Sequence, residues 1–442
     1  MMTRNRIRAC LSTVALAAHY LVCAITMDDA AMGAEPSVGR GWQQKQFIVT
    51  FWCPPPATDE NLRRVADEHY NLTWVPEKDL DVAARHRLRA MLTSPLLLPS
   101  SLDTPAERDR LDALIDRVKN HPAMEAYFIV DEPGAGAFAD LARLVAHLRE
   151  RDPAHLAYIN LFPTYASEAQ LGVSADAAAR KRVGIPENFA GVGTTDRTVL
   201  AYRDYLQKYV KIVKPDLISY DHYHFLKGGN DGKQYFLNLA LIREAALASG
   251  KPFLNIVQAC NLEKAWRLPN LAERRFLAYT TLAYGGRGVS YFVYWYDKGV
   301  GALYENAKPS SMAKEVVVLN EEMEKLGPTL LALDSLAVYH TTPLPYGAQA
   351  APADAPIRVT GKGEFVFGLF GKKGGPPAAF MVVNRDYRNA ARAEIWIGSA
   401  AKAVQEFDRQ FGKWGDSRIQ VTDQIARIDL APGDGRLLRV AE

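Results

Sequence analysis

Between residues 46 and 295 the chain alternates short apolar runs with stretches of helical periodicity. Eight runs are rich in β-branched and aromatic residues, and they span residues 46–53, 70–76, 89–94, 124–130, 155–162, 216–223, 252–259 and 288–295. Strands that are apolar along their whole length are typical of parallel sheets buried on both faces. Eight successive strand–helix units therefore predict an α/β fold of the (β/α)₈ TIM-barrel type within residues 40–328.

The main alternative for such a pattern is a doubly wound open sheet. That fold usually carries a glycine-rich phosphate-binding loop after its first strand. Here the first apolar run ends at Cys53 and is followed by three consecutive prolines, Pro54 to Pro56. Because these prolines exclude a glycine-rich loop, the pattern favours the barrel.

After Gly327 the pattern changes to short alternating segments separated by glycine, proline and aspartate. Examples are "EFVFGLFG", "AAFMVVNRD" and "ARAEIWIG". Period-2 alternation broken by turn residues is typical of antiparallel strands with one buried face. We therefore expect a C-terminal antiparallel β-sandwich domain at residues 333–442.

The N-terminus has the pattern of a secretory signal peptide. Three arginines within the first eight residues precede an apolar run at residues 9–25. Cleavage could follow Ala24 or Gly33, so residues 1–34 are predicted to be removed. The alternative is an anchoring helix, but the run is short and contains a histidine and a tyrosine. We expect a periplasmic or secreted protein with no stable membrane insertion after cleavage.

Charge and cysteine content narrow the class of partner. The chain has 53 basic and 50 acidic residues, a formal net charge of +3, and no dense Lys/Arg cluster. This balance gives no basis for nucleic-acid binding. Cys53 and Cys260 are the cysteines beyond the predicted signal; they could form a disulfide or remain thiols, and their spacing does not decide. The sequence leaves the oligomeric state open.

In a TIM barrel the active site lies at the C-terminal ends of the strands. The residues at those ends that we select as candidates are Trp52, Trp74, Asp131, Glu132, Asn160, Asp221, Tyr223, Gln258, Tyr294 and Trp295. Aromatic faces with a few placed polar groups suit a sugar ring. Cleaving a glycosidic bond requires a proton donor and a second carboxylate. The set predicts a carbohydrate substrate and a glycosidase that needs no cofactor and no metal.

The stretch "YFIVDEPGAG" at residues 127–136 places two adjacent acids at the end of the fourth run. Acids at a strand–helix junction often cap the next helix. Here the next helical pattern begins near Ala137, too far from Glu132 for capping. We therefore assign catalytic roles to Asp131 and Glu132.

The alternation of side chains along the sixth run indicates a third carboxylate in the site, Asp221. Alternation along the sixth run places Ser219, Asp221 and Tyr223 on one face, and the more apolar Ile218, Tyr220 and His222 on the other. The apolar set should face the helices, so Asp221 and Tyr223 should point into the barrel mouth. His222 and His224 form a His-x-His pair that could ligate a metal, although no second histidine cluster completes a site.

Two segments resemble a known family. The stretch 271–297, "LAERRFLAYTTLAYGGRGVSYFVYWYD", resembles the last strand–helix unit of retaining glycoside hydrolases of the family 42 β-galactosidase type. The C-terminal "LAPGDGRLLRV" resembles the closing strand of the sandwich that many of these enzymes carry. The resemblance implies a sugar-cleaving enzyme on a (β/α)₈ barrel, with Glu132 as the proton donor after strand 4.

The chain also departs from that family. The family has Asn-Glu after strand 4, where this chain has Asp131-Glu132, and a nucleophilic Glu after strand 7, where this chain has Gln258. The nearest following acid is Glu263. One scheme pairs Glu132 with Asp221 as nucleophile or base. The Asp-Glu-Pro motif also resembles substrate-assisted hexosaminidases of families 20 and 123, which implies that Asp131 orients a 2-acetamido group while Glu132 donates the proton.

Two other functions stay open. A non-catalytic carbohydrate-binding protein on a degenerate barrel would account for the missing strand-7 carboxylate. A metal-dependent hydrolase would use Asp221, His222 and His224.

In all cases we expect the long segment 163–198 after the fifth strand to line the substrate cleft, because loops of this length are often lids. The sugar, its anomer, the linkage and the stereochemical course are not specified by the sequence.

Overall fold

The computed structural model describes residues 41–186, 189–229, 231–262, 264–296, 300–398 and 402–441. The predicted signal peptide at residues 1–34 lies outside these ranges, as does Glu263. Within the described ranges, no helix combines the length and the apolar character that crossing a membrane requires.

Eight parallel strands form the N-terminal part. They are β1 (Ile48–Phe51), β2 (Leu72–Val75), β3 (Arg89–Leu92), β4 (Met124–Asp131), β5 (Leu156–Leu161), β6 (Ile218–His222), β7 (Phe253–Gln258) and β8 (Gly288–Phe292). Hydrogen-bonded neighbours follow the order β1-β8-β7-β6-β5-β4-β3-β2. The seam between β1 and β2 is closed by the Thr50 hydroxyl, which donates to the Leu72 carbonyl oxygen at 2.8 Å. The predicted TIM barrel is confirmed.

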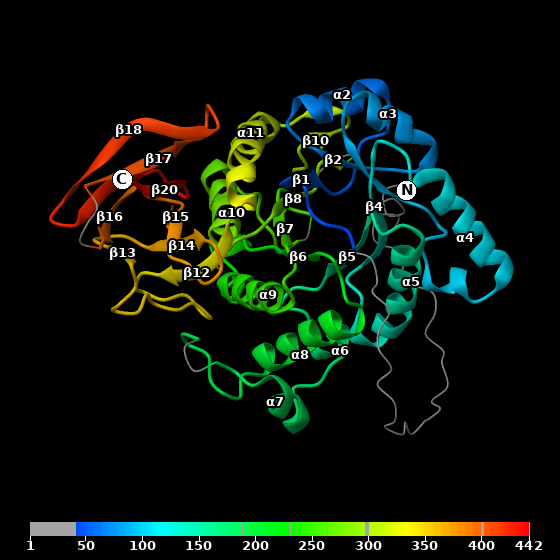
Figure 1. The fold of residues 1–442 in the computed structure, drawn as a ribbon, viewed down its shortest axis with the longest axis horizontal. Coiled ribbons are helices and arrows are strands. Elements are labelled where there is room, and N and C mark those ends of the chain that lie inside the picture. Colours follow the sequence, from blue (N-terminus) through cyan, green and yellow to red (C-terminus); the bar gives the residue numbers. More distant parts are fainter. Residues whose placement is uncertain are drawn as a thin grey trace.

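Helices surround this barrel (Figure 1). The main ones are α2 (Asp59–Asp67), α3 (Leu80–Arg85), α4 (Pro105–Val118), α5 (Phe138–Arg151), α8 (Arg197–Ile212), α9 (Tyr235–Ser249), α10 (Leu271–Ala283) and α11 (Ser311–Leu331). Helix α4 shows why these segments are helical. The Thr104 side chain caps its N-terminus, Pro105 occupies the first position, and Leu111, Leu114, Ile115 and Val118 form one buried stripe.

The long connection between β5 and α8 carries two short helices, α6 (Glu168–Leu171) and α7 (Ala177–Val183). Ser167 caps α6 with a capping box that includes Gln170. Helix α7 packs against α8 on the outside of the barrel. The connection therefore has one part near the barrel mouth and another part remote from it.

The C-terminal part is an antiparallel β-structure, as predicted. Its strands are β12 (Asp334–His340), β13 (Ile357–Thr360), β14 (Phe365–Gly371), β15 (Pro377–Asn384), β16 (Ala391–Ile397), β17 (Ala403–Asp408), β18 (Lys413–Thr422), β19 (Ile425–Leu430) and β20 (Gly435–Ala441). Long β18 pairs with β17 at one end and β19 at the other, which joins two leaves. Side chains such as Phe367, Ile395 and Val404 form the core of this sandwich.

Helix α10 lies between the barrel and the sandwich and contacts β14, β15 and β20 (Figure 1). The close approach depends on Gly368 of β14. A Cβ atom at that position would lie 2.0 Å from the carbonyl oxygen of Ala283 at the end of α10. The sandwich therefore rests on a helix of the barrel, away from the strand ends that carry the site.

Candidate active site

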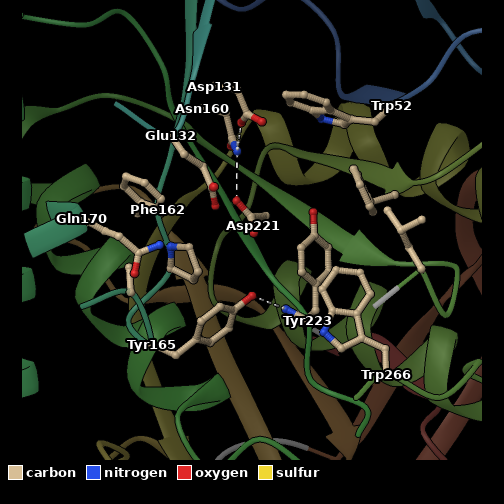
Figure 2. A pocket seen from close by; sticks show the side chains of 14 residues that line it. Trp52, Asp131, Glu132, Asn160, Phe162, Tyr165, Gln170, Asp221, Tyr223 and Trp266 are labelled. Carbon is tan, nitrogen blue, oxygen red and sulfur yellow. Dashed lines mark hydrogen bonds between the residues drawn. The ribbon is translucent and has the colours of Figure 1, made fainter. Parts of the chain in front are cut away.

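A cavity of about 310 Å³ lies at the C-terminal ends of the barrel strands (Figure 2). Its walls are formed by Trp52, Asp131, Glu132, Asn160, Phe162, Pro163, Tyr165, Ala166, Gln170, Asp221, Tyr223, Leu262, Trp266 and Phe292. The strands thus bring all three predicted carboxylates into one cavity. Of the predicted substrate-binding residues, Trp52, Asn160 and Tyr223 are among the wall residues.

Asp131 and Glu132 both face the cavity although they are neighbours at the end of β4. Strict alternation would send them to opposite faces of the sheet. Glu132 instead adopts a left-handed backbone conformation with φ of 47°, and its N–H donates to the Asn160 carbonyl oxygen at 2.9 Å. A non-glycine residue in this region costs about 1–3 kcal/mol. The surrounding contacts therefore hold a strained turn that places two acids side by side.

The turn after Glu132 is held from two sides. The Tyr205 hydroxyl of α8 donates to the carbonyl oxygen of Pro133 at 2.8 Å. Helix α6 packs directly onto the next residue, since a Cβ atom on Gly134 would lie 2.7 Å from the carbonyl oxygen of Gln170. The wall formed by α6 and the turn that carries Glu132 are therefore one packed unit.

Gly134→Ala is expected to disturb this unit. The φ of Gly134 is −71°, a value that alanine adopts without strain, so the substitution tests space alone. We expect a loss of about 1–3 kcal/mol of stability or an equivalent displacement of α6, with reduced activity, measured by thermal unfolding and by kcat/KM. Gly136→Ala is the matched control, because a Cβ atom at that position would meet no other segment within 4 Å. Equal behaviour of the two variants would contradict the packing described.

Asn160 of β5 connects two of the acids. Its Nδ2 donates to Asp131 Oδ1 at 3.0 Å and to Asp221 Oδ1 at 2.9 Å (Figure 2). Its Oδ1 accepts from the Ser219 hydroxyl at 3.1 Å. Because Ser219 donates there, it must accept from the Tyr158 hydroxyl at 2.8 Å. This chain of hydrogen bonds fixes which way the amide points, so Asn160 presents donors to both carboxylates.

The carboxyl groups of Glu132 and Asp221 lie close enough that each changes the pKa of the other. Burial, followed by the negative charges of Asp221 and Asp131, raises the pKa of Glu132 far above its usual range. Burial and the charge of Asp131 also raise the pKa of Asp221, to about 7, while the hydrogen bond from Asn160 and the neighbouring Glu132 carboxyl oppose this effect. Glu132 therefore keeps its proton to a higher pH than Asp221 does.

Asp131 is the third acid. Burial raises its pKa to about 6, and the hydrogen bond from Asn160 works in the opposite direction. Asp131 is therefore ionised at neutral pH. At neutral pH the site then holds Glu132 as a proton donor, Asp131 as an anion, and Asp221, whose pKa is about 7. Carboxyl groups whose pKa values are separated in this way can take acid and base roles.

Aromatic side chains form the opposite wall. Tyr223 and Trp266 lie with ring centroids 4.3 Å apart, and Tyr223 lies 5.2 Å from Phe292. Across the cavity, Tyr165 is 49% exposed, and its hydroxyl accepts a long hydrogen bond from the Tyr223 N–H at 3.4 Å. These flat faces can cover the C–H faces of a sugar ring while the acids meet its oxygen atoms.

Two other predicted residues lie behind the cavity walls. Trp74 is buried with its ring 4.8 Å from both Trp52 and Phe128, so it forms the packed layer beneath the cavity floor. Gln258 is fully buried at the end of β7. Its Oε1 accepts from the Phe225 N–H, and its Nε2 donates to three carbonyl oxygens. Gln258 therefore shapes the loops that carry the aromatic wall and does not line the cavity.

The predictions for Tyr294 and Trp295 placed the end of β8 too late. The strand ends at Phe292, and this residue lines the cavity. Tyr294 is buried with its hydroxyl donating to Glu68 at 2.8 Å. Trp295 stacks on Tyr304, with centroids 6.0 Å apart, in a small separate sheet. Both side chains belong to the packing beyond the strand end.

The histidines do not converge with Asp221. His222 lies on the opposite face of β6, where its Nδ1 lies 2.9 Å from Asn238 Oδ1 of α9. The Nδ1 of His224 lies 3.0 Å from the Gly232 carbonyl oxygen. In the described residues no group of three or more His, Cys, Asp or Glu side chains is arranged to hold a metal ion. The three-residue metal site considered from the sequence is therefore not assembled.

The long connection after β5 lines the cavity only in part. Pro163, Tyr165, Ala166 and Gln170 are wall residues, but none of the described residues from 171 to 198 is. Trp266 and Leu262 come from the loop after β7, and Phe162 follows β5. The sequence did not single out Trp266 and Leu262, because the candidates were taken from strand ends and loop positions cannot be placed by counting strands.

Comparisons with known proteins give similarity of fold only. No family model matches the chain, and no curated protein matches it. A β-galactosidase from the psychrophilic Marinomonas ef1 is 12% identical over 64% of this chain and 60% of that chain, with a TM-score of 0.45. An α-galactosidase I from Mortierella vinacea is 8% identical over 92% of this chain and 99% of that chain, with a TM-score of 0.46.

A GH30 endoxylanase from Clostridium papyrosolvens C71 is 10% identical over 91% of this chain and 98% of that chain, with a TM-score of 0.40. This chain thus spans about three fifths of the Marinomonas protein and nearly all of the other two. At these identities and TM-scores the similarities say nothing about what this chain does.

Proposed function

We propose that this protein is an exported glycoside hydrolase that cleaves O-glycosidic bonds of an oligo- or polysaccharide, with Glu132 as the proton donor. The observation that carries the proposal is the convergence of Glu132 with the carboxyl groups of Asp131 and Asp221 in one cavity walled by aromatic rings, where the pKa of Glu132 is raised. A neutral carboxyl at pH 7 is what protonation of a leaving oxygen requires. Export follows from the signal-like sequence at residues 1–34.

The remaining polar groups have defined roles in this proposal. Glu132 donates its proton to the glycosidic oxygen as the bond from that oxygen to the anomeric carbon breaks. Positive charge then develops at the anomeric carbon, and the carboxylates of Asp131 and Asp221 stabilise it electrostatically. Asn160 keeps both carboxylates in place, and Tyr158 and Ser219 keep Asn160 in its orientation.

The second catalytic group is either Asp221 or the substrate itself. Retaining enzymes hold their carboxyl groups about 5–5.5 Å apart and inverting enzymes about 6.5–9.5 Å apart. In the first scheme Asp221 acts as nucleophile or base, and the distance between its carboxyl group and that of Glu132 has to match one of these two spacings. In the substrate-assisted scheme Asp131 orients a 2-acetamido group, and Asp221 remains an electrostatic partner.

A panel of 4-nitrophenyl glycosides tests the proposal. It should contain both anomers of common hexosides and pentosides, together with 2-acetamido-2-deoxyhexosides. Release of 4-nitrophenol from at least one member is expected. A requirement for the 2-acetamido group would select the substrate-assisted scheme, and turnover of simple hexosides would select Asp221. If sugars bind without turnover of any member, the protein is a carbohydrate-binding protein instead.

The pH dependence of activity should follow from Asp131 and Asp221. Both carboxyls must be ionised, and their pKa values are about 6 and about 7. We therefore expect kcat/KM to fall as the pH drops from about 7 through about 6, and to stay high above this range because the pKa of Glu132 is raised further. A pH profile of wild type and Asp131→Asn measures this. Asp131→Asn should have a shallower decrease of kcat/KM toward low pH, because Asp221 alone then titrates, and a decrease as steep as in wild type would contradict the role given to Asp131.

A further inference from the structure

The amide of Gln170 is fixed at the rim of the cavity by its own helix. The Ser167 N–H and hydroxyl donate to Gln170 Oε1 at 3.0 and 2.9 Å. A backbone N–H can only donate, so the oxygen of this amide is identified by its partner and the nitrogen is the other atom. Among the residues that the structure describes, none accepts a hydrogen bond from Gln170 Nε2. Figure 2 shows this nitrogen directed into the cavity.

The position of this donor is coupled to the acids. The backbone of Gln170 packs on Gly134, two residues after Glu132, so the donor and the acid belong to the same wall. Tyr223 and Trp266 form the wall across from them (Figure 2). A ring that stacks on the aromatic wall therefore meets Glu132 and the Gln170 Nε2 along its other edge.

The charges of the walls restrict what can enter. The wall residues include Asp131, Glu132 and Asp221, and none of the described wall residues is a lysine, arginine or histidine. Asp131 is half-buried and Asp221 is buried, and Asn160 donates a hydrogen bond to each of these acids. A carboxylate, sulfate or phosphate on the ligand would add a third anion without any cation to pair with it. Burial of an unpaired charge is strongly unfavourable.

We propose that this cavity selects an uncharged sugar and that Gln170 is a specificity-determining residue, which donates its Nε2–H to an acceptor oxygen on the ring. The proposal names the substrate class of the hydrolase proposed above and rests on that function for the site, but it concerns binding alone. The cavity is thus built to discriminate a hydroxymethyl sugar from the corresponding uronate.

Gln170→Glu is the sharpest variant for this test. Glutamate is as good as glutamine at this position of a capping box, so Ser167 keeps its partner and α6 keeps its start. The substitution replaces the donor by an anion in an isosteric side chain. Gln207→Glu is the matched control, because it makes the same charge change at an exposed position of α8.

Binding is measured by titration calorimetry with paired probes. The pairs are the methyl glucosides and methyl glucuronides, and the methyl galactosides and methyl galacturonides, in both anomers. We expect wild type and Gln207→Glu to bind at least one neutral probe at least tenfold more tightly than its uronate partner. Gln170→Glu should bind that neutral probe at least tenfold more weakly, with an unchanged melting temperature.

Three results would overturn the inference: a uronate bound as tightly as its neutral partner, equal affinities of wild type and Gln170→Glu, or no neutral probe bound by wild type. These results are separable from failure of the proposed function. A protein that binds neutral sugars through Gln170 but hydrolyses none of the 4-nitrophenyl panel would refute the hydrolase and leave this assignment standing.

Discussion

Glu132→Gln should lower kcat/KM by roughly 10²–10⁴-fold, the usual contribution of a general acid. Glutamine is isosteric with glutamate, but it cannot transfer a proton. The loss should depend on the leaving group. It should be largest for alkyl glycosides, whose leaving oxygen needs protonation, and smaller for 2,4-dinitrophenyl glycosides, whose leaving group departs as a stable anion.

Glu68→Gln is the control for this experiment. Glu68 is also a buried glutamate whose pKa burial raises, but its partners are the hydroxyls of Tyr294 and Tyr304, behind the end of β8. We expect its variant to keep the wild-type dependence on the leaving group. If Glu132→Gln keeps full activity on alkyl glycosides, Glu132 is not the proton donor.

Asp221→Asn should abolish efficient turnover and at the same time stabilise the fold. Asp221 is 3% exposed and close to two other carboxyls without a cation. Asparagine can still accept the hydrogen bond from Asn160, so the substitution removes the repulsion between carboxyl groups and keeps that hydrogen bond. We expect the free energy of unfolding at pH 8 to rise by about 1–3 kcal/mol, as when buried charges are replaced by neutral groups of similar shape.

The pH dependence of stability shows whether these carboxyl groups stabilise or destabilise the folded state at a given pH. The folded state raises the pKa of Asp131, Glu132 and Asp221 above their unfolded values, so it binds more protons than the unfolded chain. Their contribution to stability is therefore most favourable at low pH and is lost as the pH rises, through about 6 for Asp131 and higher for the coupled pair. Asp221→Asn should show a smaller loss than wild type in thermal unfolding between pH 5 and 9.

Asp152→Asn is the matched control, with the opposite sign. Asp152 is buried too, but hydrogen bonds from His155 and Tyr127 outweigh burial and hold its pKa below the usual range. Its replacement should destabilise the protein at neutral pH. Destabilisation by Asp221→Asn, or a steeper pH dependence in that variant, would contradict the account of the carboxyl cluster.

The barrel could be predicted because each strand is a distinct apolar run, and an amphipathic helical stretch or turn residues separate it from the next run. The eight observed strands all lie within the predicted runs or extend them by one residue. The side-chain alternation along β6 was also predictable. Ser219 and Asp221 form hydrogen bonds with Asn160 inside the barrel, and His222 contacts Asn238 of α9 outside it. Alternation is a local rule that holds wherever a strand is regular.

The rest of the site depends on departures from regular structure. No pattern predicts that Glu132 adopts a positive φ, because the strain is stabilised by partners distant in the sequence, such as Tyr205. The end of β8 was misjudged because the apolar run continues past Phe292 into residues that pack elsewhere. Gln170 lies in the short helix α6 within a long connection and Trp266 lies in a loop, and tertiary contacts determine the course of both segments.

The protonation of Glu132 at neutral pH is the central claim, and infrared difference spectroscopy tests it directly. The spectrum of wild type minus Glu132→Gln at pH 7, without substrate, isolates this one carboxyl group. The account predicts the carbonyl stretch of a protonated carboxylic acid, which shifts on exchange into D₂O and persists well above pH 7. A difference spectrum that contains only the two carboxylate stretches at pH 7 would show that Glu132 is ionised, and would contradict its role as the proton donor.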